Sequence, residues 1–263
     1  MGKLNKKIIL GISFILIVIV MSWTTLYILS ERKIISVSAT EISPIKKTNV
    51  NEISKIGLVG DSWVSDNKLD YQIEETLNSL NVQVDIISSG HPGAKSKSIL
   101  KNLISDETNE NSSNHILTDN DIQYVIVIAG VNDTAGHIGS DFYSNHMIEI
   151  VKLLNINGKI PLILEAPNYG ISEKEKFKSS LKHNFYKVLF DDNKTDVIDE
   201  YREELIDVLY GTELNYEIVK FPSNIKYYEQ DVNLYKDQFH LNKDGNLILG
   251  EYLGNQIYQL TSQ

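Results

Sequence analysis

The stretch KIGLVGDS, residues 55–62, leads from a short apolar run into a glycine, an aspartate and a serine. An apolar run of this length is typical of a strand that is buried on both faces of a parallel sheet. The small polar residues after it are typical of a turn into a helix, where Asp61 or Ser62 caps the first turn. The stretch therefore predicts a strand, a tight turn and the start of a helix.

Three other polar segments lie beside predicted elements in the same way: Ser89–Gly93 after the apolar run Val84–Ser88, Gly130–Asp133 after Val125–Ala129, and Asp237–His240 before the last helix. A serine hydroxyl is a weak nucleophile, so it needs an imidazole to accept its proton and a carboxylate to orient the imidazole. The attacked oxygen needs N–H donors for its developing charge. Each segment alone is typical of a turn or a cap, but the four in this order indicate a serine-based catalytic site.

Short apolar runs alternate with amphipathic stretches through most of the chain. We expect strands at Ile56–Val59, Val84–Ser88, Val125–Ala129, Ile160–Leu164 and Val197–Ile198. The amphipathic stretches predict helices at Tyr71–Leu80, Ser96–Ile104, Phe142–Leu154 and Lys243–Leu260, the last one capped by Asn242. This alternation predicts a doubly wound α/β domain, with a central parallel sheet of about five strands between two helical layers. Ligands bind such a sheet outside the carboxyl ends of its strands, where Ser62, Gly93 and Asn132 fall.

The same four segments resemble the sequence blocks of the SGNH (GDSL-type) hydrolases, which are serine esterases and lipases of three-layer, flavodoxin-like build. The resemblance covers about Lys55 to Leu260. It implies that Ser62 is the nucleophile, that His240 is the general base and that Asp237 orients His240. It also implies an oxyanion hole formed by the backbone N–H groups of Ser62 and Gly93 and by the side chain of Asn132.

Further positions near these blocks are expected to contact substrate: Asp61 and Trp63 beside the nucleophile, and Asn168 and Tyr169 after the fourth strand. Trp63 stands where many SGNH hydrolases have leucine, which bears on the shape of the pocket. The histidines other than His240 are scattered without the spacing of metal ligands, and the chain has no glycine-rich phosphate loop. We therefore expect neither a metal nor a cofactor.

The N-terminus carries a stretch that is long enough to cross a bilayer. Ile8–Leu29 is a run of 22 residues without a charged side chain, and Lys3, Lys6 and Lys7 precede it. Lysines at that flank predict that the N-terminal end stays in the cytoplasm and that the rest of the chain lies outside. The alternative is a signal peptide cleaved after Ala39, which would release a secreted protein.

Charge and composition divide the chain at the same place. Residues 1–50 carry seven Lys and Arg against two Asp and Glu, whereas the remainder carries 18 against 33. An acidic domain of this kind does not favour nucleic acid as a partner. The absence of cysteine excludes disulfides and thiolate chemistry. We expect a cytoplasmic N-terminus and membrane anchor at residues 1–30, a polar stalk at 31–54 and a catalytic domain at 55–263.

These observations together predict a single-pass membrane protein with an extracytoplasmic serine esterase domain. The expected substrate is an O-acetyl or other short acyl ester on an envelope or environmental glycan, or a small ester. Two alternatives remain open at this point. One is an SGNH-type acyltransferase that modifies an envelope polymer, and the other is a non-catalytic glycan-binding or scaffold protein that keeps the fold.

Overall fold

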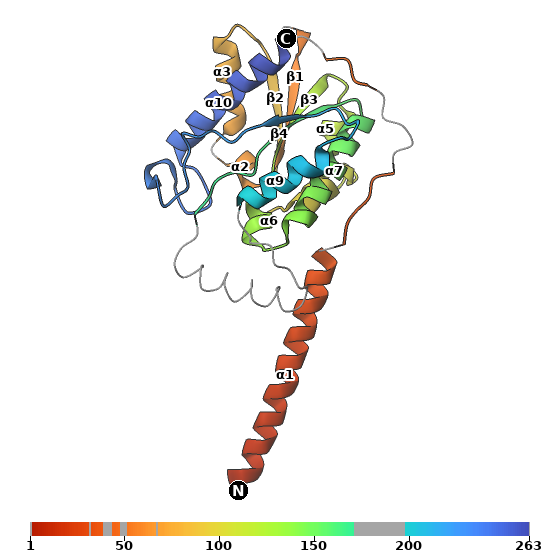
Figure 1. Cartoon of the computed structure of the whole chain (residues 1–263), viewed down its shortest axis with the longest axis vertical. Helices are drawn as coiled ribbons and strands as arrows, with labels where there is room; N and C mark the ends of the chain where they lie inside the picture. Colours follow the sequence, from red (N-terminus) through yellow and green to blue (C-terminus); the bar gives the residue numbers. More distant parts are fainter. Residues whose placement is uncertain are drawn as a thin grey trace. The chain divides into compact units, whose positions relative to one another are not determined.

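A five-stranded parallel sheet forms the centre of the α/β domain (Figure 1). The computed structural model describes residues 2–31, 33–38, 44–47, 52–66, 68–170 and 198–262. Within them the strands are β1 (Lys55–Gly60), β2 (Asp85–Gly90), β3 (Ile122–Ile128), β4 (Ile160–Leu164) and β5 (Glu217–Val219). The strand order is β2-β1-β3-β4-β5, and every neighbouring pair is parallel. This is the order of flavodoxin-like sheets.

The register brings the carboxyl ends of the first three strands to one edge of the sheet. Gly60 at the end of β1 pairs with Gly90 of β2 on one side and with Ile128 of β3 on the other. The polar segments that follow these strands therefore emerge side by side. β1, β3 and β4 consist almost entirely of buried apolar residues, as expected for strands covered on both faces.

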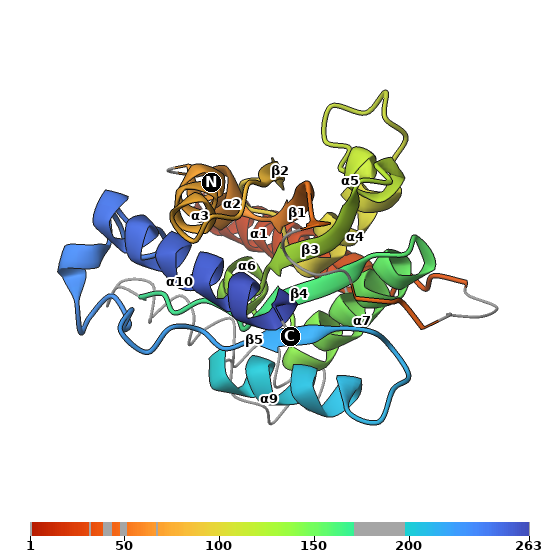
Figure 2. The ribbon, with the colours of Figure 1, turned by 90° about the horizontal axis from the view of Figure 1, so that it is seen from above.

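Helices cover the two faces of the sheet and make the three layers (Figure 2). On one face, α3 (Leu69–Ser79) packs against α10 (Lys243–Thr261). On the other face, α7 (Ser140–Ile156) packs against α4 (Ser96–Ile104) and α9 (Ile198–Leu209). The remaining short elements are α2 (Ser62–Ser65), α5 (Asn114–Thr118), α6 (Val131–Ala135) and the 3-10 turn η2 (Val232–Leu234). Buried apolar side chains form two clusters, and the sheet separates them. The predicted three-layer fold is confirmed.

One predicted strand is wrong. Ile198 is the first residue of helix α9, and Val197 lies outside the described residues. The fifth strand is instead β5, three residues long, at the edge of the sheet next to β4. Glu217 begins β5 and only its last residue is fully buried, so the strand leaves little apolar signal in the sequence.

The N-terminal unit, residues 1–34, is the helix α1 (Gly2–Glu31) and the few residues after it. Its segment Leu10–Tyr27 is long and apolar enough to cross a membrane, and its large apolar side chains are exposed. A membrane anchor and a signal sequence share these properties. Ala39, the alternative cleavage site, lies outside the described residues.

The described parts of the predicted stalk, residues 35–38 and 44–47, lie along the α/β domain. Val37 N donates to the carboxylate of Glu149 at 2.6 Å. Further along, the carbonyl of Lys46 accepts from Gln123 Nε2 at 2.8 Å, and Lys47 forms an ion pair with Glu217. Ile35, Val37 and Ile45 pack against the two apolar clusters.

Candidate active site

Ser62 lies on a sharp turn between β1 and the short helix α2. The carboxylate of Asp61 caps that helix by accepting a hydrogen bond from Trp63 N at 2.9 Å. Cβ of any residue at position 60 would lie 2.3 Å from the carbonyl oxygen of Ile128, so only glycine allows the turn to lie this close to β3. The turn places Ser62 at the carboxyl edge of the sheet, with its residue 8% exposed.

His240 lies on a tight hairpin, residues 234–242, directly before helix α10. Tyr235 and Leu241 form an antiparallel bridge, and Lys236 N donates to the carbonyl of His240 at 3.0 Å. At the tip, Asp237 Oδ1 accepts from the backbone N–H groups of Phe239 and His240 at 2.8 and 2.9 Å. We call this segment the His240 hairpin. Its backbone bonds fix the side chain of Asp237 beside the imidazole.

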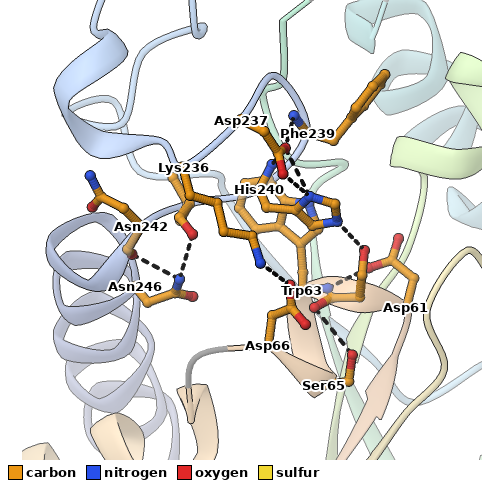
Figure 3. Close-up of polar contacts among 12 residues, drawn as sticks. Asp61, Trp63, Ser65, Asp66, Lys236, Asp237, Phe239, His240, Asn242 and Asn246 are labelled. Atoms are coloured by element: carbon orange, nitrogen blue, oxygen red, sulfur yellow. Dashed lines mark hydrogen bonds and ion pairs between the residues drawn. The ribbon is translucent and has the colours of Figure 1, made fainter.

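The structure brings Ser62, Asp237 and His240 together (Figure 3). His240 Nε2 is 3.0 Å from Ser62 Oγ. His240 Nδ1 is 2.8 Å and 2.9 Å from the two carboxylate oxygens of Asp237. A carboxylate at Nδ1 fixes the tautomer in which Nε2 is free to accept the serine proton. The geometry is therefore suited to activating the Ser62 hydroxyl, and the three roles stay predictions.

Asp237 keeps its charge at acidic pH. Partial burial acts to raise its pKa, but hydrogen bonds from Phe239 N, from the His240 ring and from His240 N outweigh burial and lower the pKa. A carboxylate beside Nδ1 favours the protonated imidazole that forms when the histidine takes a proton. Asp237 is thus ionised throughout the pH range in which an imidazole titrates.

The three predicted oxyanion donors follow three adjacent strands, β1, β2 and β3. Gly93 has φ +76°, a conformation that favours glycine, and no acceptor among the described residues is bonded to its N–H. Asn132 Nδ2 donates to Asp61 Oδ2 and to the carbonyl of Ala94, each at 3.1 Å. Both amide hydrogens of Asn132 therefore have acceptors here. Asn132 serves as an oxyanion donor only if one of these two bonds is shared or released.

No family model and no curated protein matches the sequence. Solved structures do match the fold. The lipase/acylhydrolase from Enterococcus faecalis is 16% identical with TM-score 0.52, and the match covers 79% of this chain and 96% of that one. The psychrotrophic esterase EstA from Pseudoalteromonas sp. is 12% identical with TM-score 0.56, covering 80% and 100%. The acetylxylan esterase Axe2 from Geobacillus stearothermophilus is 13% identical with TM-score 0.56, covering 80% and 96%.

The chain has the SGNH-hydrolase fold. At one edge of its sheet, the His240 hairpin meets the segments that follow β1, β2 and β3. At these identities the likeness concerns the fold, and the chemistry rests on the contacts of Ser62, Asp237 and His240.

Two buried carboxyl groups lie behind the nucleophile. Burial raises the pKa of Asp61 to about 7, and the nearby Asp133 adds to the rise, against the bonds from Trp63 N and Asn132. Burial likewise raises the pKa of Asp133 to about 6, although Ser96 donates to it from both its N–H and its hydroxyl. Asp61 is fully buried, and both of its oxygens accept bonds from the protein. It therefore holds the turn, and its contact with substrate stays a prediction.

The other predicted substrate contacts also have protein partners. Trp63 is 3% exposed and its ring packs edge-on against Phe221, with centroids 6.0 Å apart. Tyr169 is 5% exposed and its ring stacks on Phe239. Asn168 donates to the carbonyl of Ile225 at 2.9 Å. Contact of these three side chains with substrate stays a prediction.

Sequence reasoning missed two charged residues near the site. Lys236, next to Asp237, forms an ion pair with Asp66 at the end of α2 (Figure 3). Arg202 on α9 bonds the loop that follows β4. One feature of the sequence could have pointed to Arg202: the chain has arginine only at positions 32 and 202 and lysine at its other strongly basic positions. Among the described residues, no three His, Asp or Glu side chains are grouped to hold a metal ion.

Proposed function

We propose that this chain is a membrane-anchored serine ester hydrolase that acts outside the cytoplasm. Its proposed reaction removes O-acetyl or other short acyl groups from an envelope or environmental glycan. The observation that carries the proposal is the 3.0 Å contact between Ser62 Oγ and His240 Nε2, with Asp237 bonded to the opposite ring nitrogen. A histidine placed between a hydroxyl and a carboxylate is the arrangement that activates serine for acyl transfer.

The proposed reaction has two steps. Ser62 Oγ attacks the ester carbonyl carbon while His240 Nε2 takes the hydroxyl proton, and the carbonyl oxygen becomes negatively charged. That oxygen accepts hydrogen bonds from the N–H groups of Ser62 and Gly93 and from Asn132 Nδ2. His240 then gives its proton to the departing alcohol oxygen, which leaves Ser62 acylated. Water attacks this ester with His240 as base and releases the acid.

The proposed location rests on the N-terminal helix. The apolar segment Leu10–Tyr27 of α1 and the lysines before it support an anchor whose N-terminal end is inside the cell. Cleavage after Ala39 would instead give a secreted form of the same hydrolase. The acidic α/β domain favours neither nucleic acid nor an anionic membrane surface as its partner.

The proposed substrate class is the finer part of the proposal. An acetylxylan esterase shares the fold, which supports an acetylated glycan as substrate. An acyltransferase would use the same residues and pass the acyl group from Ser62 to a sugar hydroxyl instead of to water. Product analysis separates the two reactions. We therefore expect free acetate or another short acid when the full-length protein is incubated with purified envelope fractions, as measured by mass spectrometry.

The test of the chemistry uses the full-length protein in detergent. It is expected to hydrolyse p-nitrophenyl acetate and to take up one fluorophosphonate label, and Ser62→Ala is expected to abolish both. Ser65→Ala is the matched control, since Ser65 is an exposed serine on the same short helix. Its label and activity are expected to stay at the wild-type level. Labelling that persists in Ser62→Ala would contradict the proposal and favour a non-catalytic protein.

A further inference from the structure

The loop after β4, residues 165–170, supports the His240 hairpin. We call it the β4 loop. It makes three contacts with the hairpin. Gly170 N donates to the Gln238 carbonyl at 2.6 Å, and the Tyr169 ring stacks on Phe239 with centroids 5.5 Å apart. The Tyr235 hydroxyl lies 3.2 Å from the Asn168 carbonyl and 2.7 Å from the Lys226 carbonyl, and these two acceptors share its proton. Gln238 and Phe239 stand between Asp237 and His240 in the sequence. The β4 loop therefore holds the tip of the hairpin, where both proposed catalytic side chains originate.

The contact at Gly170 requires a close approach. A Cβ at this position would lie 2.4 Å from Cβ of Tyr228, so any side chain at position 170 would push the loop away. Gly170 thus packs directly against Tyr228, in the segment that leads into the hairpin. Groups that hold the β4 loop in place therefore also support the hairpin tip.

Arg202 of helix α9 also holds the β4 loop. From helix α9, its Nε donates to the Ala166 carbonyl at 3.0 Å, and its Nη2 donates to the same carbonyl at 2.5 Å and to Asn168 Oδ1 at 2.8 Å. The side chain is 16% exposed. A planar guanidinium satisfies two acceptors with a fixed geometry, whereas a lysine ammonium is a point charge on a flexible stem. These bonds therefore specify the orientation of the loop as well as holding it.

The same guanidinium also reaches the nucleophile side of the site. It lies over the ring of Phe221, 5.7 Å from the centroid. Phe221 in turn packs edge-on against Trp63, the residue that follows Ser62. Arg202 is therefore packed against supports of both Ser62 and the His240 hairpin, although it touches neither reacting side chain.

We propose that Arg202 is a positioning residue that sets the distance between Ser62 Oγ and His240 Nε2. The proposal rests on the proposed hydrolase function and adds a residue outside its catalytic group. Ser62 and His240 are 178 positions apart and belong to different elements, so tertiary contacts and not chain connectivity determine their separation. A displacement of about 1 Å in such a pair lowers catalysis by up to about 10²-fold.

The expected signature is a loss of kcat without a shift of the pH profile. Asp237 and His240 lie on one hairpin and keep their mutual bond if the hairpin moves as a unit. The protonation equilibrium of the pair then stays the same, while the proton transfer from Ser62 slows. Because Arg202 bonds Asn168, a predicted substrate contact, KM is measured separately, and an effect on substrate binding alone would raise KM and leave kcat unchanged. A role in stability alone would lower Tm and leave kcat per folded site unchanged.

The experiment compares four forms of the full-length protein in detergent: wild type, Arg202→Lys, Arg202→Met and Asp199→Asn. Asp199 is the matched control because, among the described residues, its carboxylate accepts from Arg202 Nη1 alone, and its side chain is 64% exposed. Active sites are counted by fluorophosphonate titration, and kcat, KM and the pH profile are measured with p-nitrophenyl acetate. Hydrogen exchange of the β4 loop and the His240 hairpin gives a readout that does not depend on hydrolysis.

We expect kcat per site to fall about 10- to 10²-fold in Arg202→Met and less in Arg202→Lys, with exchange of both segments at least about tenfold faster. Asp199→Asn is expected to match wild type. Unchanged hairpin exchange, or faster exchange with unchanged kcat per site, overturns the proposal. If Arg202→Met does not fold, Arg202→Lys and Asn168→Ala decide by the same criteria. If wild type neither labels nor hydrolyses, the hydrolase function fails, and hairpin exchange alone then supports or overturns the positioning role.

Discussion

Lys236 Nζ lies 2.5 Å from Asp66 Oδ2, and this ion pair joins the His240 hairpin to the end of the helix that carries Ser62. The two side chains are 42% and 31% exposed, so solvent screens their attraction. Partly exposed pairs typically contribute about 0.2–1 kcal/mol. The ion pair thus stabilises the fold only weakly, but it lies where a small movement changes the geometry of the proposed catalytic side chains.

A double-mutant cycle tests the Lys236–Asp66 ion pair. Lys236→Met and Asp66→Asn are each expected to lower kcat/KM by up to about fivefold, the factor that corresponds to about 1 kcal/mol. The double variant should lose little more than either single variant, because the same interaction is lost only once. In about 1 M salt the loss of kcat/KM should be smaller, because salt already weakens the ion pair in wild type. Additive losses that do not depend on salt would show that the two residues act independently.

Asn132→Ala is expected to lower kcat by about 10²–10³-fold while KM stays nearly constant, the typical loss for one oxyanion donor. The measurement is steady-state hydrolysis of p-nitrophenyl acetate, with circular dichroism to check folding. In the structure Asn132 donates to Asp61 and Ala94, so the alternative is that Asn132 only stabilises the turn. If so, Asn132→Ala lowers Tm and leaves kcat unchanged.

The roles of Asp237 and His240 are separated by pH profiles. His240→Ala is expected to be nearly inactive, because the proton acceptor is gone. Asp237→Asn keeps an oxygen for the backbone N–H groups of Phe239 and His240 but removes the charge, so activity should fall less. The measurement is kcat/KM across pH for wild type, Asp237→Asn and His240→Ala on one short-chain ester. A profile without any titration between about pH 5 and 8 in wild type would contradict histidine as the base.

Asp133 predicts a stability difference that grows with pH. Its folded-state pKa is raised by burial to about 6, above the ordinary value of 3.8. The folded protein therefore binds this proton more tightly than the unfolded chain, and the contribution of Asp133 to stability is lost as pH rises through that window. Asp133→Asn keeps the oxygen that Ser96 bonds and does not titrate. Denaturant unfolding should show that the free energy of unfolding of Asp133→Asn rises relative to that of wild type, by on the order of 1–3 kcal/mol, between about pH 4 and 6. A constant difference across that range would argue against the raised pKa.

The absence of cysteine allows a clean test of topology. Tyr210 is 85% exposed on the α/β domain, so Tyr210→Cys should react with a membrane-impermeant maleimide added to intact cells. Asn5→Cys, before the apolar segment, should react only after the cells are lysed. The opposite pattern would place the α/β domain in the cytoplasm. Edman sequencing of the same protein shows whether the chain starts at Thr40, as cleavage after Ala39 requires.

The sequence predicted the parts of the fold that depend on local patterns. Strands buried on both faces, such as β3 and β4, leave continuous apolar runs. Asn242 caps α10 as expected, because its side-chain oxygen accepts hydrogen bonds from the N–H groups of Asp244 and Gly245. Ligands bind a doubly wound sheet outside the carboxyl ends of its strands, so strand order predicts that edge for Ser62. The pairing of Ser62 with His240 was implied by the resemblance to the SGNH hydrolases.

The features that could not be predicted from the sequence depend on contacts between distant residues. β5 is a three-residue edge strand, and its pairing with β4 stabilises it more than its own propensity does. The contacts of Arg202 with the β4 loop and of Lys236 with Asp66 join positions 34 and 170 residues apart. Neither pair has a fixed spacing that a sequence pattern could contain. The roles of the proposed site residues likewise stay predictions until the variants are measured.

The separation of Ser62 and His240 by 178 positions also has a consequence for the newly made chain. Helix α1 and Ser62 are synthesised first, while the His240 hairpin and α10 come last. During most of translation, Ser62 therefore has no His240 beside it. A chain that stops between Val219 and Asp237 contains β1 to β5 but lacks the proposed base, so its Ser62 hydroxyl is expected to be unreactive. If Ser62 is the nucleophile, its reaction with a fluorophosphonate should therefore mark chains that are full-length and folded.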